Sequence, residues 1–399
     1  MTAQAPLLDI IMATMSSAQR PLDFALLSRY PRSKIDFEKL KLGAKNAQAV
    51  YPSTGSIFQQ NSWLLRPDKN FDLRSARAQN ATQAQEEIAN FINEDFDIKN
   101  EFPIKQLLLE DDSSEFVTLV TRLHHAAGDL QSLSFWLECQ LSNQSALSET
   151  EPLRLKSVAK KISKSPFSFW GPSDRLWFSG KKLSAQRRWK TFEFQALAKH
   201  PDFTYNDILC TCALETARSW NLQQGTSGQK ISLWVPINIR EKGSRGFGNG
   251  TSRIRLYARE YSPSLIKKCL HTRQQVNVSK KNGEWMFPLR PKILSLPPSL
   301  SAPLLRAHIH RPWVDMGTLL FSHFEQPANG SRRFLDSELV VHLHERYPLG
   351  MAAITEAGVT RLTLTYDPQL LLGSEMETFA NLFLSHLRRF KDELEGNCL

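Results

Sequence analysis

The stretch at residues 115–140, EFVTLVTRLHHAAGDLQSLSFWLECQ, decides the fold that we expect for this chain of 399 residues. Residues 116–123 are rich in β-branched and apolar side chains, and they predict a short buried strand. Small residues follow at 126–128, and apolar side chains then recur at helical spacing, at Leu130, Leu133, Leu137 and Leu141. The pattern therefore predicts that a strand gives way to a helix across a tight turn.

Three polar residues stand at this turn, His124, His125 and Asp129. If the extended conformation continues through His125, its ring lies on the apolar face of the strand and is held rigidly, with one ring nitrogen free. Imidazole has an unperturbed pKa of about 6.5, which suits proton transfer near neutral pH. Asp129 could orient the histidine, orient the turn or cap the helix. The simpler interpretation is a packed pair of histidines followed by an N-capping aspartate.

The composition is that of a soluble globular protein, with 41% hydrophobic and 23% charged residues. A chain of this length is too long for one ordinary core, so we expect two. No apolar run approaches the roughly 20 residues that span a bilayer, and the N-terminus lacks the basic start of a secretory signal. The five cysteines are scattered and odd in number, which favours reduced thiols. We therefore expect a cytoplasmic protein.

Residues 142–190 form the least regular stretch and carry a cluster of lysines and arginines that ends with Arg187, Arg188 and Lys190. We place the crossing between two halves here, and we expect an N-terminal subdomain at 1–175 and a C-terminal subdomain at 176–399. The basic side chains are expected to form a solvated connector, and a docking surface for an acidic partner is the alternative. The net charge of +10 favours an anionic partner.

Periodicity and capping signals predict the remaining elements. Residues 22–49 predict a short helix, a turn and a second, amphipathic helix that is capped by Asp36. Strict alternation at 231–240 predicts a strand on which Asn238 and Arg240 share a face. Other helices are expected at 80–93 and after the capping boxes at 204–207 and 374–377, and other strands at 56–65, 104–109, 253–257, 318–324, 339–344 and 358–366.

The motif at 124–129, HHAAGD, resembles the HHxxxDG signature of the chloramphenicol acetyltransferase and peptide-synthetase condensation-domain superfamily, with Leu130 in place of the final Gly. Residues 96–107 are similar to the run "FDl…Pl…l" of condensation domains, and 203–207 resemble the start of a helix in the second half. Residues 235–240 and 248–249 resemble the segment "PVNxR…GN". The strand at 362–366 and the final helix resemble the C-terminal part of the family's domains. The resemblance thus covers nearly the whole chain.

The resemblance implies an α/β (α+β) fold of two chloramphenicol acetyltransferase-like subdomains. In this family they form a V-shaped pseudo-dimer with a central tunnel, and the resemblance places His125 at the middle of that tunnel. The family's reaction moves an acyl group from a thioester, on coenzyme A or on the phosphopantetheine arm of a carrier protein, to a hydroxyl or an amine. We therefore expect a stand-alone acyltransferase that forms an ester or an amide in secondary metabolism or lipid modification. Neither a metal nor a permanently bound cofactor is implied.

Roles for individual residues also follow from the resemblance. His125 is expected to be the general base or positioning group, while His124 and Asp129 are mainly architectural and Asp129 pairs with an arginine. The expected supports of the tunnel and of that pairing are Arg240 and Asn249, with Asn238 on the same strand as Arg240. An oxyanion donor is also needed, and Ser322 is the candidate. Leu130 could narrow the route of one substrate or rearrange the turn.

Two other functions compete with this hypothesis. A catalytically silent relative would bind a carrier protein or a ligand as a scaffold, and replacement of His125 would then leave binding intact. Nucleic-acid binding through the basic connector would show an affinity that falls steeply with salt. It is the weaker alternative, because no nucleic-acid motif accompanies the positive charge. We expect the partners to be an acidic carrier protein or acyl-coenzyme A, together with a small alcohol or amine, and we expect a monomer.

The histidine pairs at 308/310 and 342/344 have the spacing of residues on one face of a strand. Zinc needs a third or fourth protein ligand, and none can be assigned to either pair from the sequence. We therefore expect these histidines to be surface or packed residues.

Overall fold

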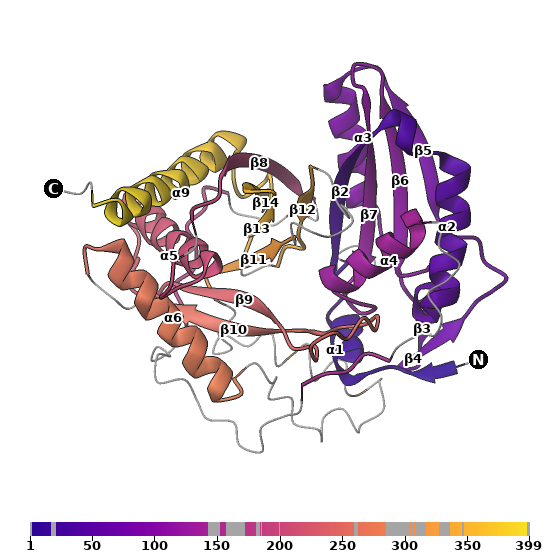
Figure 1. The fold of residues 1–399 in the computed structure, drawn as a ribbon, viewed down its shortest axis with the longest axis horizontal. Coiled ribbons are helices and arrows are strands. Elements are labelled where there is room, and N and C mark those ends of the chain that lie inside the picture. The colour runs from indigo at the N-terminus through magenta and orange to yellow at the C-terminus, as the bar shows by residue number, and fades with distance from the viewer. Residues whose placement is uncertain are drawn as a thin grey trace.

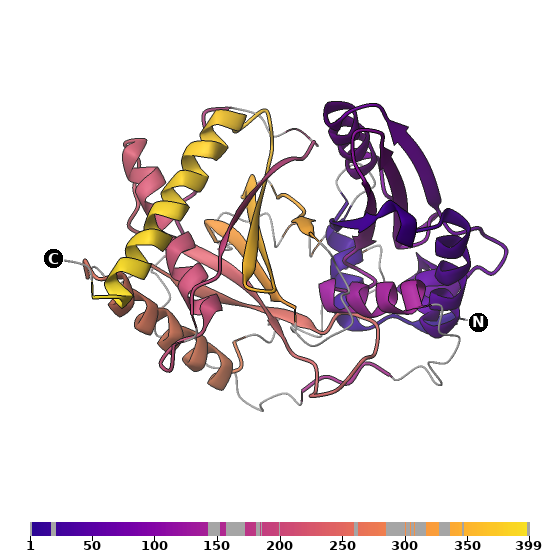
Figure 2. The same cartoon turned by 45° about the horizontal axis from the view of Figure 1, so that its top comes forward.

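The structure is a computed structural model that describes residues 2–16, 21–142, 152–156, 172–180, 184, 186–198, 200–258, 262–284, 317–326, 336–344 and 347–396, with the single residues 300, 304 and 307. Two α/β halves lie side by side, each built on its own sheet (Figure 1). Helices cover the outer face of the C-terminal sheet, and its other face is turned toward the N-terminal half (Figure 2). The predicted α/β class with two subdomains is therefore confirmed. Within the described residues, no helix has both the length and the apolar character that a bilayer crossing requires.

The N-terminal sheet has the strand order β12-β2-β7-β6-β5. Its strands are β2 (Asp23–Pro31), β5 (Leu73–Ala78), β6 (Ile104–Asp111), β7 (Phe116–His124) and β12 (Glu338–Val340). β5 runs parallel to β6, and the other neighbours are antiparallel. The helices α2 (Phe37–Val50) and α4 (Leu130–Ser142) cover one face of this sheet, and α3 (Ala81–Asn93) covers the other.

The strand β7 lies near the middle of this sheet and is buried on both faces, which explains its nearly unbroken apolar sequence. Leu119 and Leu123 pack in the cluster that contains α2 and α4, whereas Val120 packs with α3 on the opposite face. The predicted strand at 116–123 and the predicted helix after Asp129 are thus confirmed. The two histidines lie at the end of β7 and in the tight turn that leads to α4.

A small sheet and the helix α1 (Leu7–Met15) lie below this sheet in Figure 1. The small sheet has the order β1-β4-β3, with β1 (Thr2–Gln4), β3 (Ser56–Gln59) and β4 (Ser62–Leu65). The other elements are the short 3₁₀ turns η1 (Arg32–Lys34) and η2 (Pro52–Gly55).

The C-terminal sheet has the strand order β10-β9-β11-β13-β14-β8. Its strands are β8 (Arg188–Gln195), β9 (Ser232–Asn238), β10 (Thr251–Tyr257), β11 (Leu319–Glu325), β13 (Leu349–Glu356) and β14 (Val359–Tyr366). The helices α5 (Tyr205–Gln223), α6 (Leu265–Lys281) and α9 (Gly373–Leu394) pack on one face and close a large apolar core. The predicted capping box before α5 is present, because Thr204 and Asp207 bond each other's backbone.

Two crossings tie the halves together. β12 comes from the C-terminal part of the sequence but pairs with β2, with Leu339 opposite Leu26. In the other direction, residues 152–156 reach the C-terminal half, where Leu155 forms an isolated bridge with Arg240. Each half therefore receives a segment from the other part of the sequence.

Several sequence-based expectations are wrong. The final helix does not begin with a capping box at 374–377, because α9 begins at Gly373 with Leu372 as its N-cap. The short helix expected after residue 22 is the strand β2, because this segment is paired on both sides, with β7 and β12. The single strand expected at 56–65 is a hairpin of β3 and β4 that turns at Gln60 and Asn61, which have φ of 49° and 60°. The basic stretch is not wholly a solvated connector, since Arg187 is buried and bonded to Asp23.

Candidate active site

The turn after β7 is fixed by backbone hydrogen bonds. The amide of His125 donates to the carbonyl of Leu22, at 2.8 Å, and the amide of Ala127 donates to the carbonyl of His124, at 2.9 Å. β7 ends at His124, so His125 lies just beyond the strand, in the turn that leads to α4. The two neighbouring histidines consequently face different surroundings.

His124 is fully buried, and both of its ring nitrogens have partners. The amide of Ala126 donates to Nδ1, at 3.1 Å, and Nε2 lies 2.8 Å from the hydroxyl of Ser16. Because Nδ1 accepts a hydrogen bond, the proton of the neutral ring belongs on Nε2. Burial lowers the pKa of His124 to about 3, so the ring is neutral at physiological pH. These contacts suit an architectural role.

Asp129 holds the turn against the C-terminal half. Its carboxylate accepts two hydrogen bonds from Arg240, at 2.6 and 2.8 Å, in a bidentate pair. It also accepts from the amides of Ser132 and Gly250, both at 2.9 Å, and from the hydroxyl of Thr251, at 2.6 Å. Burial alone would raise the pKa of Asp129, but the charge of Arg240 and these hydrogen bonds outweigh it and lower the pKa.

The contact with Ser132 makes Asp129 the N-cap of α4, because Ser132 is the third residue of that helix. Of the roles open from the sequence, capping the helix and holding the turn are thus present. No hydrogen bond joins the carboxylate of Asp129 to the ring of His125 in the described structure.

Arg240 lies just after β9 and also contacts the loop at residues 243–250, which is rich in glycine. Its Nη2 donates to the hydroxyl of Ser132 and to the carbonyl of Gly248, both at 2.7 Å. A Cβ at Gly250 would lie 2.4 Å from the guanidinium of Arg240, so only glycine lets the loop approach this closely. The pair of Asp129 and Arg240 therefore joins the two halves beside the histidine turn.

Asn249 fixes the backbone of His125. Its side-chain amide donates to the carbonyl of His125, at 2.7 Å, and to Oδ1 of Asp9, at 2.9 Å. Asp9 lies on α1 and also accepts from the indole of Trp63, at 3.0 Å. Burial raises the pKa of Asp9 to about 6. Asp9 could not be recognised from the sequence, because its partners are distant in the chain.

The ring of His125 lines a cavity of about 230 Å³ between the two halves. It packs 4.8 Å from the ring of Phe24 and lies edge-on to the ring of His342, at 5.5 Å between centroids. Burial lowers the pKa of His125, while the charges of Asp129 and Asp23 and a hydrogen bond to the backbone of Gly128 oppose that shift. The ring is therefore neutral at pH 7 and has a nitrogen that can accept a proton.

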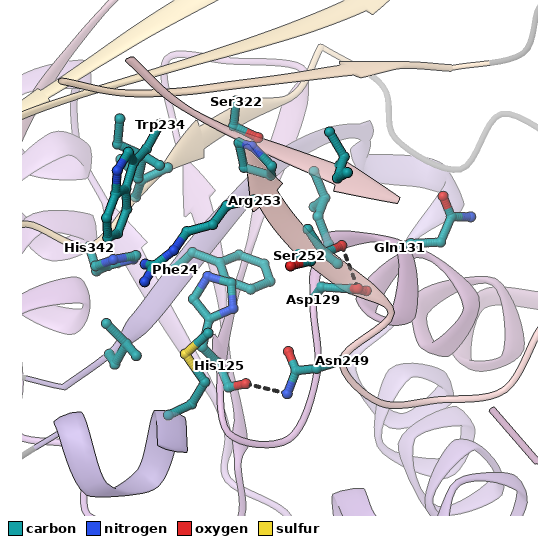
Figure 3. Close-up of a pocket in the computed structure, with 18 of the residues that line it drawn as sticks. Phe24, His125, Asp129, Gln131, Trp234, Asn249, Ser252, Arg253, Ser322 and His342 are labelled. Carbon is teal, nitrogen blue, oxygen red and sulfur yellow. Dashed lines mark hydrogen bonds between the residues drawn. The ribbon is translucent and has the colours of Figure 1, made fainter. Parts of the chain in front are cut away.

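The cavity is mostly apolar. The side chains that form its walls come from α1, β2, α4, β9, β10 and β11 and from the segment after β12, and include Met12, Met15, Leu22, Trp234, Phe324 and Val341. Asn238 and Ser322, which the sequence analysis named as candidate site residues, also line the cavity. Asn238 is exposed and accepts a hydrogen bond from the amide of Arg240, at 2.9 Å. Ser322, on β11, is drawn across the cavity from His125 in Figure 3.

Sequence reasoning missed several polar residues that the fold brings into this cavity. Arg253 and Trp234 lie on the neighbouring strands β10 and β9, and Tyr347 and His342 lie between β12 and β13. His342, which the sequence predicts to be a surface or packed residue, packs against His125 and Tyr347 and also lines the cavity. Alternation within β9 and β10 could have indicated which residues share a face, but not which face meets a cavity.

Metal ligation finds no support in the described residues, where no group of three or more His, Cys, Asp or Glu could hold an ion. His342 bonds through Nε2 to the hydroxyl of Tyr347, at 3.2 Å, and His344 stacks on the same tyrosine, at 5.2 Å. The pair at 308/310 lies outside the described residues.

Comparison with solved structures shows that the chain shares its fold with domains of nonribosomal peptide synthetases and with a wax ester synthase. The chain is similar to the epimerization domain from the third module of tyrocidine synthetase B, with a TM-score of 0.62, 13% identity and 98% of each chain covered. It is also similar to the wax ester synthase/diacylglycerol acyltransferase from Marinobacter aquaeolei VT8, with a TM-score of 0.61 and 13% identity over 98% of this chain and 99% of that one.

A third similar structure is the EpoB cyclization-docking bidomain of a nonribosomal peptide synthetase from Sorangium cellulosum. It has a TM-score of 0.61 and 11% identity, over 96% of this chain and 84% of that one. No family model matches the sequence, and no curated protein matches it. At these identities the likeness establishes the fold, and the reaction has to be argued from the site.

Proposed function

We propose that this protein is an acyltransferase that moves an acyl group from a thioester to a hydroxyl or an amine, with His125 as the general base. The observation that carries the proposal is the contrast between the two histidines. Both nitrogens of His124 have protein partners, whereas the ring of His125 borders a cavity between the halves. We therefore assign the proton transfer to His125 and not to His124.

Acyl transfer from a thioester needs few catalytic groups besides the imidazole of His125. A thioester is already activated, so the enzyme mainly holds two substrates in attack geometry and removes the proton of the acceptor. As the acceptor oxygen or nitrogen attacks the carbonyl carbon, His125 takes its proton. The imidazolium then returns a proton to the leaving sulfur as the carbon–sulfur bond breaks. The lowered pKa of His125 keeps the ring in its basic form at neutral pH.

The surrounding contacts would serve as supports. Asn249 bonds the carbonyl of His125, and the pair of Asp129 and Arg240 holds the following turn, so these residues would fix where the ring points. Ser322 is the proposed donor to the oxyanion of the tetrahedral intermediate. The substrates would reach the ring through a tunnel between residues 1–175 and 176–399.

The donor would be an acyl group on coenzyme A or on the phosphopantetheine arm of a carrier protein. Both are anionic, and the chain has a net charge of +10, which favours their approach. The similar structures include domains of nonribosomal peptide synthetases and a wax ester synthase, so carrier-linked substrates and alcohol acceptors are both reasonable first tests.

Mass spectrometry after incubation with acyl-coenzyme A and acyl-carrier donors, and with a panel of alcohols and amines, tests the proposal. The wild type should form an ester or an amide, and His125→Ala should lose at least about a thousandfold in rate while its circular dichroism spectrum stays unchanged. His124→Asn is the matched control, because an asparagine can still accept from the amide of Ala126.

The alternative function is a scaffold without catalytic activity. Leu130 is the reason to test it, because this residue replaces the glycine of the signature and lines the cavity. If the wild type binds a carrier protein but forms no product, and His125→Ala binds equally well, the protein is a scaffold. Product formation that survives in His125→Ala would also contradict the proposal.

A further inference from the structure

The side-chain amide of Asn249 has one orientation that satisfies its neighbours. Its Nδ2 donates to the carbonyl of His125, at 2.7 Å, and to Oδ1 of Asp9, at 2.9 Å, with a longer contact to the carbonyl of Ala126, at 3.4 Å. A backbone carbonyl and a carboxylate can only accept hydrogen bonds. With a pKa of about 6, Asp9 is mostly a carboxylate at pH 7. The NH₂ group of Asn249 therefore faces these acceptors, and its oxygen faces the other way.

That oxygen is a hydrogen-bond acceptor turned toward the cavity. Asn249 is 5% exposed, and no donor bonds its Oδ1 within the part of the chain that the structure describes. The residue lines the same cavity as the ring of His125. Figure 3 shows the oxygen pointing into the space beside that ring. In a mostly apolar cavity, such an atom favours a ligand that brings a hydrogen-bond donor to it.

The ring of His125 presents a second acceptor to the same space. The backbone of Gly128 bonds one nitrogen of this ring, and the other nitrogen of the neutral ring carries a lone pair. The two side chains are close, because Nδ2 of Asn249 bonds the carbonyl of His125. Two neighbouring acceptors thus border one cavity, and a ligand with two hydrogens on one atom would satisfy both.

The nucleophile of the proposed reaction has one or two such hydrogens, according to its chemistry. A neutral primary amine can direct one N–H to His125 and the other to Asn249, and its lone pair remains for the carbonyl carbon. A hydroxyl group has only one hydrogen. If that hydrogen points to His125, a lone pair of the hydroxyl oxygen faces Oδ1 of Asn249, and the two oxygens repel each other. The arrangement therefore favours an amine over an alcohol.

We propose that Asn249 binds the amino group of a primary-amine acceptor through Oδ1, and that Asp9 is the positioning residue that keeps this oxygen turned to the cavity. The inference rests on the proposed acyl transfer and narrows it to the formation of amides. As the carbon–nitrogen bond forms, His125 takes one proton from the nitrogen and returns it to the sulfur when the carbon–sulfur bond breaks. The hydrogen that bonds Asn249 stays on the nitrogen of the amide.

Turnover of three uncharged acceptors at pH 7 tests this specificity. They are O-benzylhydroxylamine, with two hydrogens on its nitrogen, its N-methyl derivative, with one, and benzyl alcohol. The donors are the hexanoyl thioesters of coenzyme A and of an acyl carrier protein. The wild type should use O-benzylhydroxylamine at least about tenfold more efficiently, in kcat/KM, than either other acceptor, because a site that bonds an N–H rejects the analogue without it.

Variants are judged by this ratio and not by the rate. Asn249→Ala also removes the contact that holds His125, so it should slow all three acceptors. A merely structural role would slow them in proportion, whereas the proposed contact predicts that the ratio falls at least about fivefold. Asp9→Ala should lower the ratio too, because it frees the amide to turn. Gln131→Ala is the matched control, since Gln131 also carries an amide and lines the cavity, and it should keep the ratio.

Isothermal titration calorimetry without a donor separates this inference from the proposed function. The wild type should bind O-benzylhydroxylamine at least about fivefold more tightly than its N-methyl derivative, and Asn249→Ala should lose that preference. Equal binding by the wild type, or a preference that survives in Asn249→Ala, would overturn the inference. Acyl transfer without the preference would overturn it as well and leave the proposed function standing. The binding preference without any product would support the contact with Asn249 and contradict the acyl transfer.

Discussion

Arg187 and Asp23 form a buried ion pair, with Nη1 of Arg187 lying 3.0 Å from Oδ1 of Asp23. Arg187 immediately precedes β8 of the C-terminal sheet, and Asp23 begins β2 of the N-terminal sheet. Asp23 also accepts a hydrogen bond from Nε of Arg122, at 2.9 Å. One carboxylate thus contacts two buried guanidinium groups. Burial would raise the pKa of Asp23, but Arg187 and Arg122 outweigh it and lower the pKa to about 2.

The first prediction concerns this cluster. Asp23→Asn should lower the free energy of unfolding by about 3–5 kcal/mol, because it leaves two arginines buried without a carboxylate. Arg187→Met should cost less, since it leaves Asp23 and Arg122 as a balanced pair. Urea unfolding followed by circular dichroism measures both. The electrostatic account fails if Asp23→Asn is no more harmful than Arg187→Met.

The second prediction is the pH dependence of catalysis. The pKa of His125 lies below its ordinary value of about 6.5, and the ring accepts a proton only when it is neutral. The value of kcat/KM should therefore be constant at neutral pH and fall about tenfold per pH unit below the pKa of His125. Initial rates between pH 4.5 and 8 measure this profile. An inflection above pH 6.5, or a rate that rises with acid, would exclude His125 as the base.

The third prediction links His124 to stability. Its folded-state pKa of about 3 is below the unfolded value, so the stability that the neutral ring contributes is complete above pH 6.5 and is lost as the pH falls toward 3. The free energy of unfolding should decrease by up to about 1.4 kcal/mol per pH unit in that range. His124→Asn has no such group.

The difference between wild type and His124→Asn isolates this effect, because the other histidines are common to both proteins. That difference should be largest above pH 6.5 and should shrink steadily in acid. A pH-independent difference would mean that His124 is not buried as a neutral ring.

The fourth prediction tests the pair of Asp129 and Arg240. Asp129→Asn should lower the free energy of unfolding by about 3–5 kcal/mol, because it leaves the guanidinium buried without its carboxylate. Arg240→Lys keeps the charge but loses the bidentate contact, so it should retain more stability than Asp129→Asn. Both variants should lose activity through misplacement of the histidine turn. A double-mutant cycle with Arg240→Met should give a coupling energy of at least about 1 kcal/mol.

The fifth prediction concerns Leu130, the first residue of α4, which lines the cavity. Leu130→Gly should lower the free energy of unfolding by about 1 kcal/mol, because glycine is a poor helix former. It should also enlarge the cavity and shift the preference toward bulkier substrates. Rates with branched and linear acceptors measure the shift, and Leu130→Ala is the control for the helix. An unchanged preference would mean that Leu130 does not border a substrate.

Much of the candidate site could be predicted from the sequence, because the site residues lie close together in the chain or in segments that resemble known motifs. The strand, turn and helix around His125 follow from a change of hydrophobic period within one short stretch. Arg240 and Asn249 could be named because their segment resembles a known pattern. The expected arginine partner of Asp129 is present at hydrogen-bond distance.

Other features could not be read from the sequence because they depend on how distant segments meet. β2 has no strong strand signal, and its conformation is set by pairing on both sides. Asp9 gains its partners only when α1 packs against residues 63 and 249. Arg253 and His342 belong to different segments, and only the assembled cavity makes neighbours of the residues that line it.

The short strand β12 has a consequence for any attempt to separate the halves. It supplies the outermost partner of β2, with three residues paired. A fragment that ends at residue 175 would lack this cover and leave the backbone amides and carbonyls of β2 open to another chain. Such an uncovered edge promotes self-association. The N-terminal fragment should therefore aggregate when produced alone, and co-expression with residues 176–399 should rescue it.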